Sequence, residues 1–205
     1  MANLRFFPIV LRVACLILAL SVASFGAAQA GVLTTLNFGG DSVDEGFSRG
    51  DPTVSCSDVF RICFSDKTQG FTGHRTIEHV SLTATLSNPF SFGELSLDLR
   101  HNGVTVFLVD FHGGQGSVTI TFDDLAAGPL PFSLVSGTFR PDDPLSAFNG
   151  LDASGDWTLR ISDNDSGDFS SYSNAVLAVT TPAPATLTLL ALGLAGLGFS
   201  RRRKH

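Results

Sequence analysis

The side chains most able to do chemistry are the carboxylates of one short polar segment. Asp163, Asp165 and Asp168 lie there beside Asn164, directly after a stretch of alternating apolar and polar residues. Calcium takes about six to eight oxygen ligands, and a turn of this kind can supply carboxylates and backbone carbonyls. Asp and Asn are also good turn formers, whose side chains bond to their own backbone. The sequence therefore leaves two interpretations open, a calcium site or a solvated turn.

No residue pattern indicates an enzyme. The histidines of the central chain are scattered without metal-ligand spacing, at His74, His79, His101 and His112. The run His112-Gly113-Gly114 is weakly similar to an esterase oxyanion loop, but a glycine-rich loop between strands is the simpler interpretation. The chain has neither a G-x-S-x-G nor an H-E-x-x-H motif. We therefore expect no catalytic residue, and no cofactor other than the calcium considered above.

The cysteines are consistent with an oxidising compartment. Cys15 lies in an N-terminal segment that we expect to be removed, which leaves Cys56 and Cys63 close together in the chain. A disulfide closing so short a loop stabilises a fold by roughly 2.5 kcal/mol in the chain-entropy model. Two thiols alone lack the second ligand pair of a structural zinc site. We expect a Cys56–Cys63 disulfide, with free thiols or intermolecular pairing as the alternatives.

The elements that must position these residues are β-strands. Apolar residues alternate with polar ones in at least five stretches, at residues 80–86, 95–100, 118–122, 157–162 and 175–179. This period of two places one face on a core and the other in water, so Trp157 should point inward with Leu159 and Ile161. Asn102-Gly103 predicts a tight hairpin. The series of short strands and turns favours an all-β sandwich.

Three motifs stand in the second half of the central chain, Gly137-Thr138-Phe139-Arg140-Pro141, Leu145-Ser146-Ala147-Phe148-Asn149-Gly150 and the run from Gly155 to Asp163. On these motifs, residues 77–179 resemble the P domain (P/Homo B domain) of kexin-type proprotein convertases. Ala175 stands where the family has a second Trp, so we interpret the match as a divergent P domain. The resemblance implies a jelly-roll-like β-sandwich over residues 76–180. Residues 31–75 are expected to add an edge strand at 32–38 and a disulfide-linked hairpin around 56–64.

The N-terminal segment has the layout of a secretory signal peptide. Arg5 makes the amino end positive, residues 13–23 are apolar, and Ala28-Gln29-Ala30 is a small-residue cleavage site. A retained membrane helix is the alternative. The segment between the two ends keeps seven Lys and Arg and all nineteen Asp and Glu, a formal net charge of −12 against −6 for the whole chain. So acidic a domain is poorly suited to nucleic acid, whose phosphates require Lys and Arg.

The C-terminal tail, residues 181–205, has three parts. A Pro-rich segment contains Pro182, Ala183 and Pro184, residues 185–199 are apolar, and the last cations are Arg201, Arg202, Arg203 and Lys204. At about 1.5 Å per residue the apolar run spans roughly 22 Å, short for a hydrocarbon core of about 30 Å. The cations should hold this end in the cytoplasm.

This order of elements resembles the PEP-CTERM tail of Gram-negative bacteria, with Ala183 where that family has Glu. The resemblance implies a short transmembrane helix, transient membrane attachment, and an exosortase and signal peptidase as the processing partners. We expect an exported, non-enzymatic protein of the cell surface or extracellular polysaccharide matrix, with a structural or adhesive role. The alternatives are a calcium-dependent glycan- or protein-binding module, and an accessory domain for a separate subtilisin-like protease.

Overall fold

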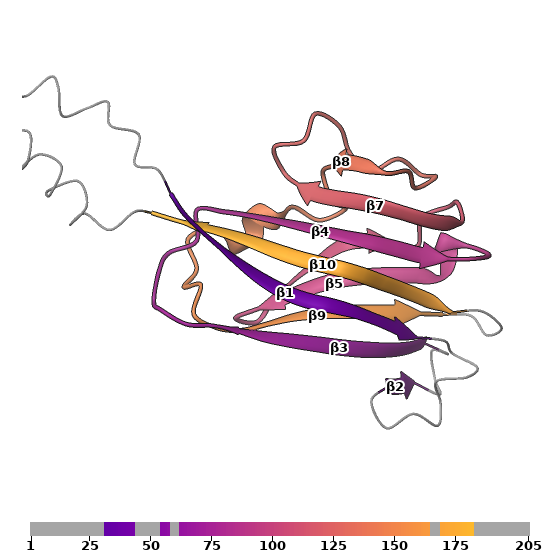
Figure 1. Ribbon diagram of the computed structural model, residues 1–205, viewed down its shortest axis with the longest axis horizontal. Helices are drawn as coiled ribbons and strands as arrows, with labels where there is room; N and C mark the ends of the chain where they lie inside the picture. Colours follow the sequence, from indigo (N-terminus) through magenta and orange to yellow (C-terminus); the bar gives the residue numbers. More distant parts are fainter. Residues whose placement is uncertain (1–30, 44–53, 58–61, 165–168, 183–205) are drawn as a thin grey trace, which may run out of the picture. The chain divides into compact units, whose positions relative to one another are not determined.

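In the part of the chain that the structure describes, a computed structural model, ten strands form two sheets (Figure 1). The structure describes residues 31–43, 54–57, 62–164 and 169–182, and residues 31–182 form one compact unit. The predicted signal peptide and nearly all of the predicted sorting tail lie outside the described residues, as do Asp165 and Asp168. The prediction of an all-β sandwich is confirmed.

Each sheet has five strands. Sheet A has the order β1 (Val32–Val43), β10 (Ser170–Thr181), β4 (His79–Asn88), β7 (Gly116–Asp123) and β8 (Gly137–Phe139). Sheet B has the order β2 (Val54–Ser57), β3 (Ile62–Phe71), β9 (Gly155–Asp163), β5 (Leu95–His101) and β6 (Val104–Asp110). Short 3₁₀ helices η3 (Phe92–Glu94) and η4 (Leu145–Phe148) lie in the connections. Figure 1 shows β1, β10, β4 and β7 side by side.

The connectivity is that of a jelly roll. Without the short edge strands β2 and β8, the two sheets read β1-β10-β4-β7 and β3-β9-β5-β6. All the pairs between these eight strands are antiparallel. This is the double-sheet arrangement that the chain adopts by crossing repeatedly from one sheet to the other. The N-terminal strands β1 and β3 pair with the last two strands, so the expected edge strand and hairpin are present in the sheets.

The core fills the space between the sheets with the inward residues of each alternating strand. Leu82, Leu86, Ile120 and Leu177 of sheet A and Leu97, Leu99 and Leu159 of sheet B have no exposed surface. Trp157 is also fully buried and donates its indole N–H to the carbonyl of Ala153 at 3.1 Å. The prediction that Trp157 is a core residue is confirmed, because it shares the inward phase of Leu159 and Ile161.

The outward face of β5 differs from the sequence-based expectation that it lies in water. Ser96 is only 4% exposed and Asp98 only 2%. The strand lies between β9 and β6, whose register places the long side chains of Arg160 and Phe107 on either side of Asp98. Alternation alone identifies which residues share a face, but it does not show how far neighbouring strands cover that face.

The Asn102-Gly103 hairpin is confirmed between β5 and β6. Both residues have positive φ angles, 48° for Asn102 and 78° for Gly103. Those angles fit the tight two-residue turn that matches the twist of paired strands. Within the described part of the chain, no helix is both long and apolar enough to cross a membrane.

Candidate functional site

The two ends of the described sandwich meet at one place. Val32 at the start of β1 pairs with Thr181 at the end of β10, and the N–H of Glu78 bonds to the carbonyl of Thr180 at 2.9 Å. The expected signal-peptidase cleavage after Ala30 therefore lies one residue before the first paired strand. The expected sorting motif begins where the last strand ends. The first and last paired residues of the sandwich, next to which both cleavages are expected, thus lie at the same end.

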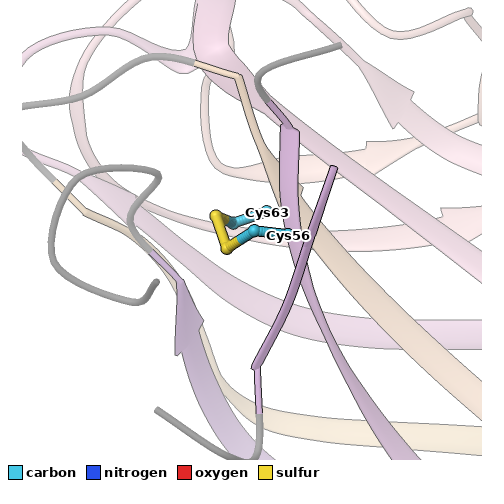
Figure 2. Close-up of a disulfide and its surroundings, with 2 residues drawn as sticks. All are labelled: Cys56 and Cys63. Carbon is cyan, nitrogen blue, oxygen red and sulfur yellow. A yellow bond between two sulfur atoms is a disulfide. The ribbon is translucent and has the colours of Figure 1, made fainter. Parts of the chain in front are cut away.

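The opposite end carries the disulfide. Cys56 on β2 and Cys63 on β3 are cross-strand partners whose Cα atoms are 4.0 Å apart, and their sulfurs are bonded (Figure 2). Cys63 is fully buried. The predicted Cys56–Cys63 disulfide is confirmed, and it joins the short edge strand β2 to the sheet.

We expect the paired substitution Cys56→Ser with Cys63→Ser to lower the free energy of unfolding by about 2.5 kcal/mol, because the open chain gains loop entropy when unfolded. Urea denaturation followed by circular dichroism measures the loss. Peptide mapping without reduction should recover the linked pair from the unchanged protein. Complete alkylation of both thiols without prior reduction would contradict the bond.

Asp163, the first residue of the acidic segment, closes the connection between β9 and β10. Its side chain is fully buried, and Oδ2 accepts the N–H of Ser170 at 3.1 Å. Among the described residues, no three His, Cys, Asp or Glu side chains gather as a metal site. Because Asp165 and Asp168 lie outside those residues, calcium binding by the three carboxylates stays a prediction.

The calcium hypothesis predicts that the melting temperature rises with millimolar calcium, since an ion that binds only the folded chain stabilises it. Asp165→Asn together with Asp168→Asn should remove the rise and leave the melting temperature in chelator unchanged. Equal melting temperatures in calcium and in sodium chloride of matched ionic strength would identify the segment as an ordinary turn.

Asp123 and Asp124, at the end of β7 and in the turn that follows it, accept hydrogen bonds from backbone N–H groups. Asp124 accepts the N–H groups of Leu145 and Ser146, at 3.0 and 2.7 Å, and so holds the start of η4. Asp123 accepts the N–H of Leu125 at 2.8 Å and lies 3.3 Å from Nε2 of His79. These contacts are structural, because Asp123 bonds within its own turn and Asp124 joins that turn to η4.

Two of the histidines fasten loops to the sandwich. Nδ1 of His112 lies 2.9 Å from the carbonyl of Pro131, and its Nε2 lies 2.9 Å from both carboxylate oxygens of Asp142. His101 is 2% exposed and stacks on Trp157, with ring centroids 4.0 Å apart. Both residues hold chain segments together, and the sequence carried no spacing signal for either contact.

His74, Asp152 and Ser154 bring together the residue types of a hydrolase triad in a different geometry. Nδ1 of His74 lies 2.6 Å from Asp152 Oδ2 and 3.1 Å from Ser154 Oγ. A triad uses the two ring nitrogens separately, one for the carboxylate and the other for the nucleophile. Here both contacts fall on one nitrogen of an exposed ring. The His74 hydrogen bond, and then the Ser154 N–H, lower the pKa of Asp152.

The outward face of sheet B forms a groove with a cavity of about 290 Å³, which we call the sheet-B groove. Register across the sheet aligns its residues in rows. One row contains Phe64, Ser162, Ser96 and Asp110, and the next contains Asp66, Arg160, Asp98 and Phe107. The groove also includes Ile62, Arg100 and Phe111.

Two bidentate ion pairs order the charged side chains of the groove. Arg160 donates from Nε and Nη2 to the two carboxylate oxygens of Asp66, each at 2.7 Å. Arg100 donates in the same way to Asp98, at 2.5 and 3.1 Å. Burial raises the pKa of Asp98, while hydrogen bonding to Arg100 and its charge oppose that rise. The guanidinium of Arg160 also lies over the ring of Phe64, 3.7 Å from its centroid.

Comparison with solved structures finds distant similarities. A chain of the complex between a serine protease of Aeromonas sobria and its chaperone is 14% identical, with a TM-score of 0.40, over 81% of this chain and 30% of that one. The A. sobria serine protease alone is 15% identical, with a TM-score of 0.39, over 80% of this chain and 29% of that one. An exo-beta-agarase is 11% identical, with a TM-score of 0.35, over 73% of this chain and 23% of that one. This chain spans less than a third of the length of each. No curated protein matches it.

The end of the chain matches a known family model. The PEP-CTERM protein-sorting motif matches residues 180–204 and overlaps the last two residues of β10. That motif implies processing by an exosortase, and it indicates export and sorting to the surface of a Gram-negative cell. This protein is therefore a β-sandwich chain that ends in a PEP-CTERM protein-sorting motif.

Proposed function

We propose that this protein is a non-enzymatic component of the cell surface or of the extracellular polysaccharide matrix, with a structural or adhesive role. The observation that carries the proposal is the sorting motif at residues 180–204, which begins in the last two residues of the last strand of the sandwich. Cleavage near Pro182 would release or transfer the whole folded domain. The tail would then direct the protein to the cell surface, and the sandwich would carry out the structural or adhesive role outside the cell.

The arrangement of the sandwich supports this role. Because Val32 pairs with Thr181, both processed ends lie at one end of the domain. β1 runs from there to Val43, which pairs with Ser170 at the other end. Strands of this length span roughly 35–40 Å, so the far end projects well away from the point of processing. The net charge of −12 between the two targeting segments favours a soluble domain outside the cell.

The contacts of the polar residues support a non-catalytic role. His112 and Asp142 hold a loop, Asp124 holds η4, and the His74 trio lacks the geometry of a proton relay. A general base must lie within hydrogen-bond reach of its nucleophile through a nitrogen that its carboxylate partner leaves available. The arrangement of these side chains is that of structural hydrogen bonds.

The experiment compares cells that lack this gene with cells that carry it on a plasmid. We expect gene loss to reduce cell aggregation and the protein content of the matrix, and the full chain to restore both. A version that ends after Pro182 should be exported but should restore neither cell aggregation nor the protein content of the matrix. Unchanged aggregation and matrix after gene loss would contradict the role. Co-purification with a subtilisin-like protease would instead support the accessory alternative.

A further inference from the structure

The floor of the sheet-B groove contains a hydroxyl without a partner. Ser96 is 4% exposed, lines the groove, and its Oγ makes no hydrogen bond within the described residues. A buried hydroxyl without a partner costs about 1–3 kcal/mol, so such groups usually have a bonding function. Asp98 lies two residues along the same strand, and each of its carboxylate oxygens can accept a hydrogen bond beyond the one from Arg100.

Aromatic side chains form the wall of the groove. Phe107 and Phe111 are each 37% exposed and line the groove. Phe111 has a φ angle of 56°, a left-handed conformation that costs an aromatic residue about 1–3 kcal/mol. The strained backbone is held by the Phe111 N–H, which donates to the carbonyl of Leu95 at 3.0 Å. The fold thus loses some stability to place an aromatic ring at this edge.

The charges of the groove offer no free cation to an anion. Among its lining residues Asp98 and Asp110 balance Arg100 and Arg160, a formal charge of zero, and Asp66, which pairs with Arg160, lies beside them. Both guanidiniums are already paired to carboxylates, so neither is available to hold an anion without breaking a bidentate pair. A neutral ligand with many hydroxyls can bond to paired carboxylates and guanidiniums without breaking those pairs.

We propose that the sheet-B groove binds a neutral saccharide. The negative face of an aromatic ring attracts the C–H bonds of a pyranose, while the Ser96 hydroxyl and the Asp98 carboxylate receive its hydroxyls. A cavity of about 290 Å³ lies just below the usual range for small-ligand sites, roughly 300–1,000 Å³, which suits one or two sugar rings of a longer chain.

The position of the groove suits this ligand. The row of Ser162 and Ser96 lies next to Asp163, which accepts the N–H of Ser170. That hydrogen bond is at the end of the sandwich remote from the pair Val32 and Thr181. A polymer can therefore reach the groove while the other end is held at the cell surface. The inference rests on the adhesive role proposed above and names the partner of that role.

The experiment uses the processed protein recovered from outside the cell. Its probe is a pool of two- to four-unit oligosaccharides, released from the matrix polysaccharide of the same cells, labelled at the reducing end and separated by anion exchange. Fluorescence anisotropy should show binding of the neutral fraction. We expect Phe107→Ala to weaken binding at least about tenfold and Ser96→Ala to weaken it about five- to tenfold, the size of one hydrogen bond. Phe90→Ala, an exposed phenylalanine outside the groove, is the matched control and should leave binding unchanged.

Several outcomes would overturn the proposal. These are no binding of the neutral fraction, preference for the anionic fraction, or equal binding by the Phe107→Ala, Ser96→Ala and Phe90→Ala variants with unchanged circular dichroism. The proposed function fails separately. A protein that reaches the surface and restores aggregation but does not bind sugar contradicts only the groove inference. A protein that binds sugar but whose gene loss changes nothing contradicts only the adhesive role.

Discussion

Trp157→Ala should lower the free energy of unfolding by about 3–5 kcal/mol, the range for removing a large buried aromatic. Trp157 has no exposed surface, stacks on His101 with planes 3° apart, and contacts Phe148 with ring centroids 5.1 Å apart. Its indole N–H also bonds to Ala153. The substitution therefore opens a cavity and leaves the His101 ring without its stacking partner.

Urea denaturation followed by circular dichroism measures this loss, because the substitution removes the chain's one Trp and with it the fluorescence signal. Phe169→Ala is the control, since that ring is 56% exposed and its loss should change stability by no more than about 0.5 kcal/mol. The unchanged protein should show blue-shifted Trp emission when folded. Equal stability of the two variants, or emission typical of water in the folded state, would contradict the buried site.

Arg100→Met should destabilise the fold by about 3 kcal/mol at pH 7. The substitution removes both guanidinium hydrogen bonds from Asp98, whose side chain is 3% exposed, and breaking a buried ion pair from one side costs about 3–5 kcal/mol. We expect the lower end because Arg100 is itself partly exposed and the charge of Arg160 still acts on Asp98. Chemical denaturation at fixed pH measures the difference from the unchanged protein.

The same substitution should make stability depend more strongly on pH. Burial raises the pKa of Asp98 above its unfolded value, so the stability that this group contributes is present below the unfolded pKa and lost as pH rises through the folded pKa. Without Arg100 the folded pKa rises further. The variant should therefore approach the unchanged protein as the pH falls, when the carboxyl is protonated in both folded and unfolded chains.

The double variant Asp98→Asn with Arg100→Met is the matched control for this prediction. It has no carboxylate to leave uncompensated, so it should be more stable than Arg100→Met alone at pH 7 and should lose the added pH dependence. A double variant as unstable as the single one would show that Arg100 contributes by packing alone. A single variant whose loss of stability is constant with pH would likewise show that the charge of Arg100 does not act on Asp98.

The strands could be predicted because their information is local. Alternation placed Leu97, Trp157 and Leu177 in the core, and Asn102-Gly103 marked its hairpin, since each pattern depends on residues adjacent in the chain. The disulfide followed from short separation and expected export. The motifs quoted for the P-domain resemblance fall on β8, η4 and β9, and they implied the jelly-roll sandwich that the topology confirms.

The groove could not be predicted because it depends on register between strands distant in sequence. Phe64, Ser162, Ser96 and Asp110 become neighbours only when β3, β9, β5 and β6 pair in that order. The burial of Asp98 follows from the same pairing. His101 was similarly hidden, since only the fold places it against Trp157, and a lone histidine carries no such signal.

The intact mass of the protein recovered from outside the cell tests the central claim of export and sorting most directly. We expect a chain that begins at Gly31 and ends near Pro182, without the apolar segment or the cluster Arg201 to Lys204. Cells that lack their exosortase should retain the C-terminal segment on the protein. A mass that still includes residues 187–205 in normal cells would show that the tail is a permanent anchor, and it would contradict sorting by cleavage.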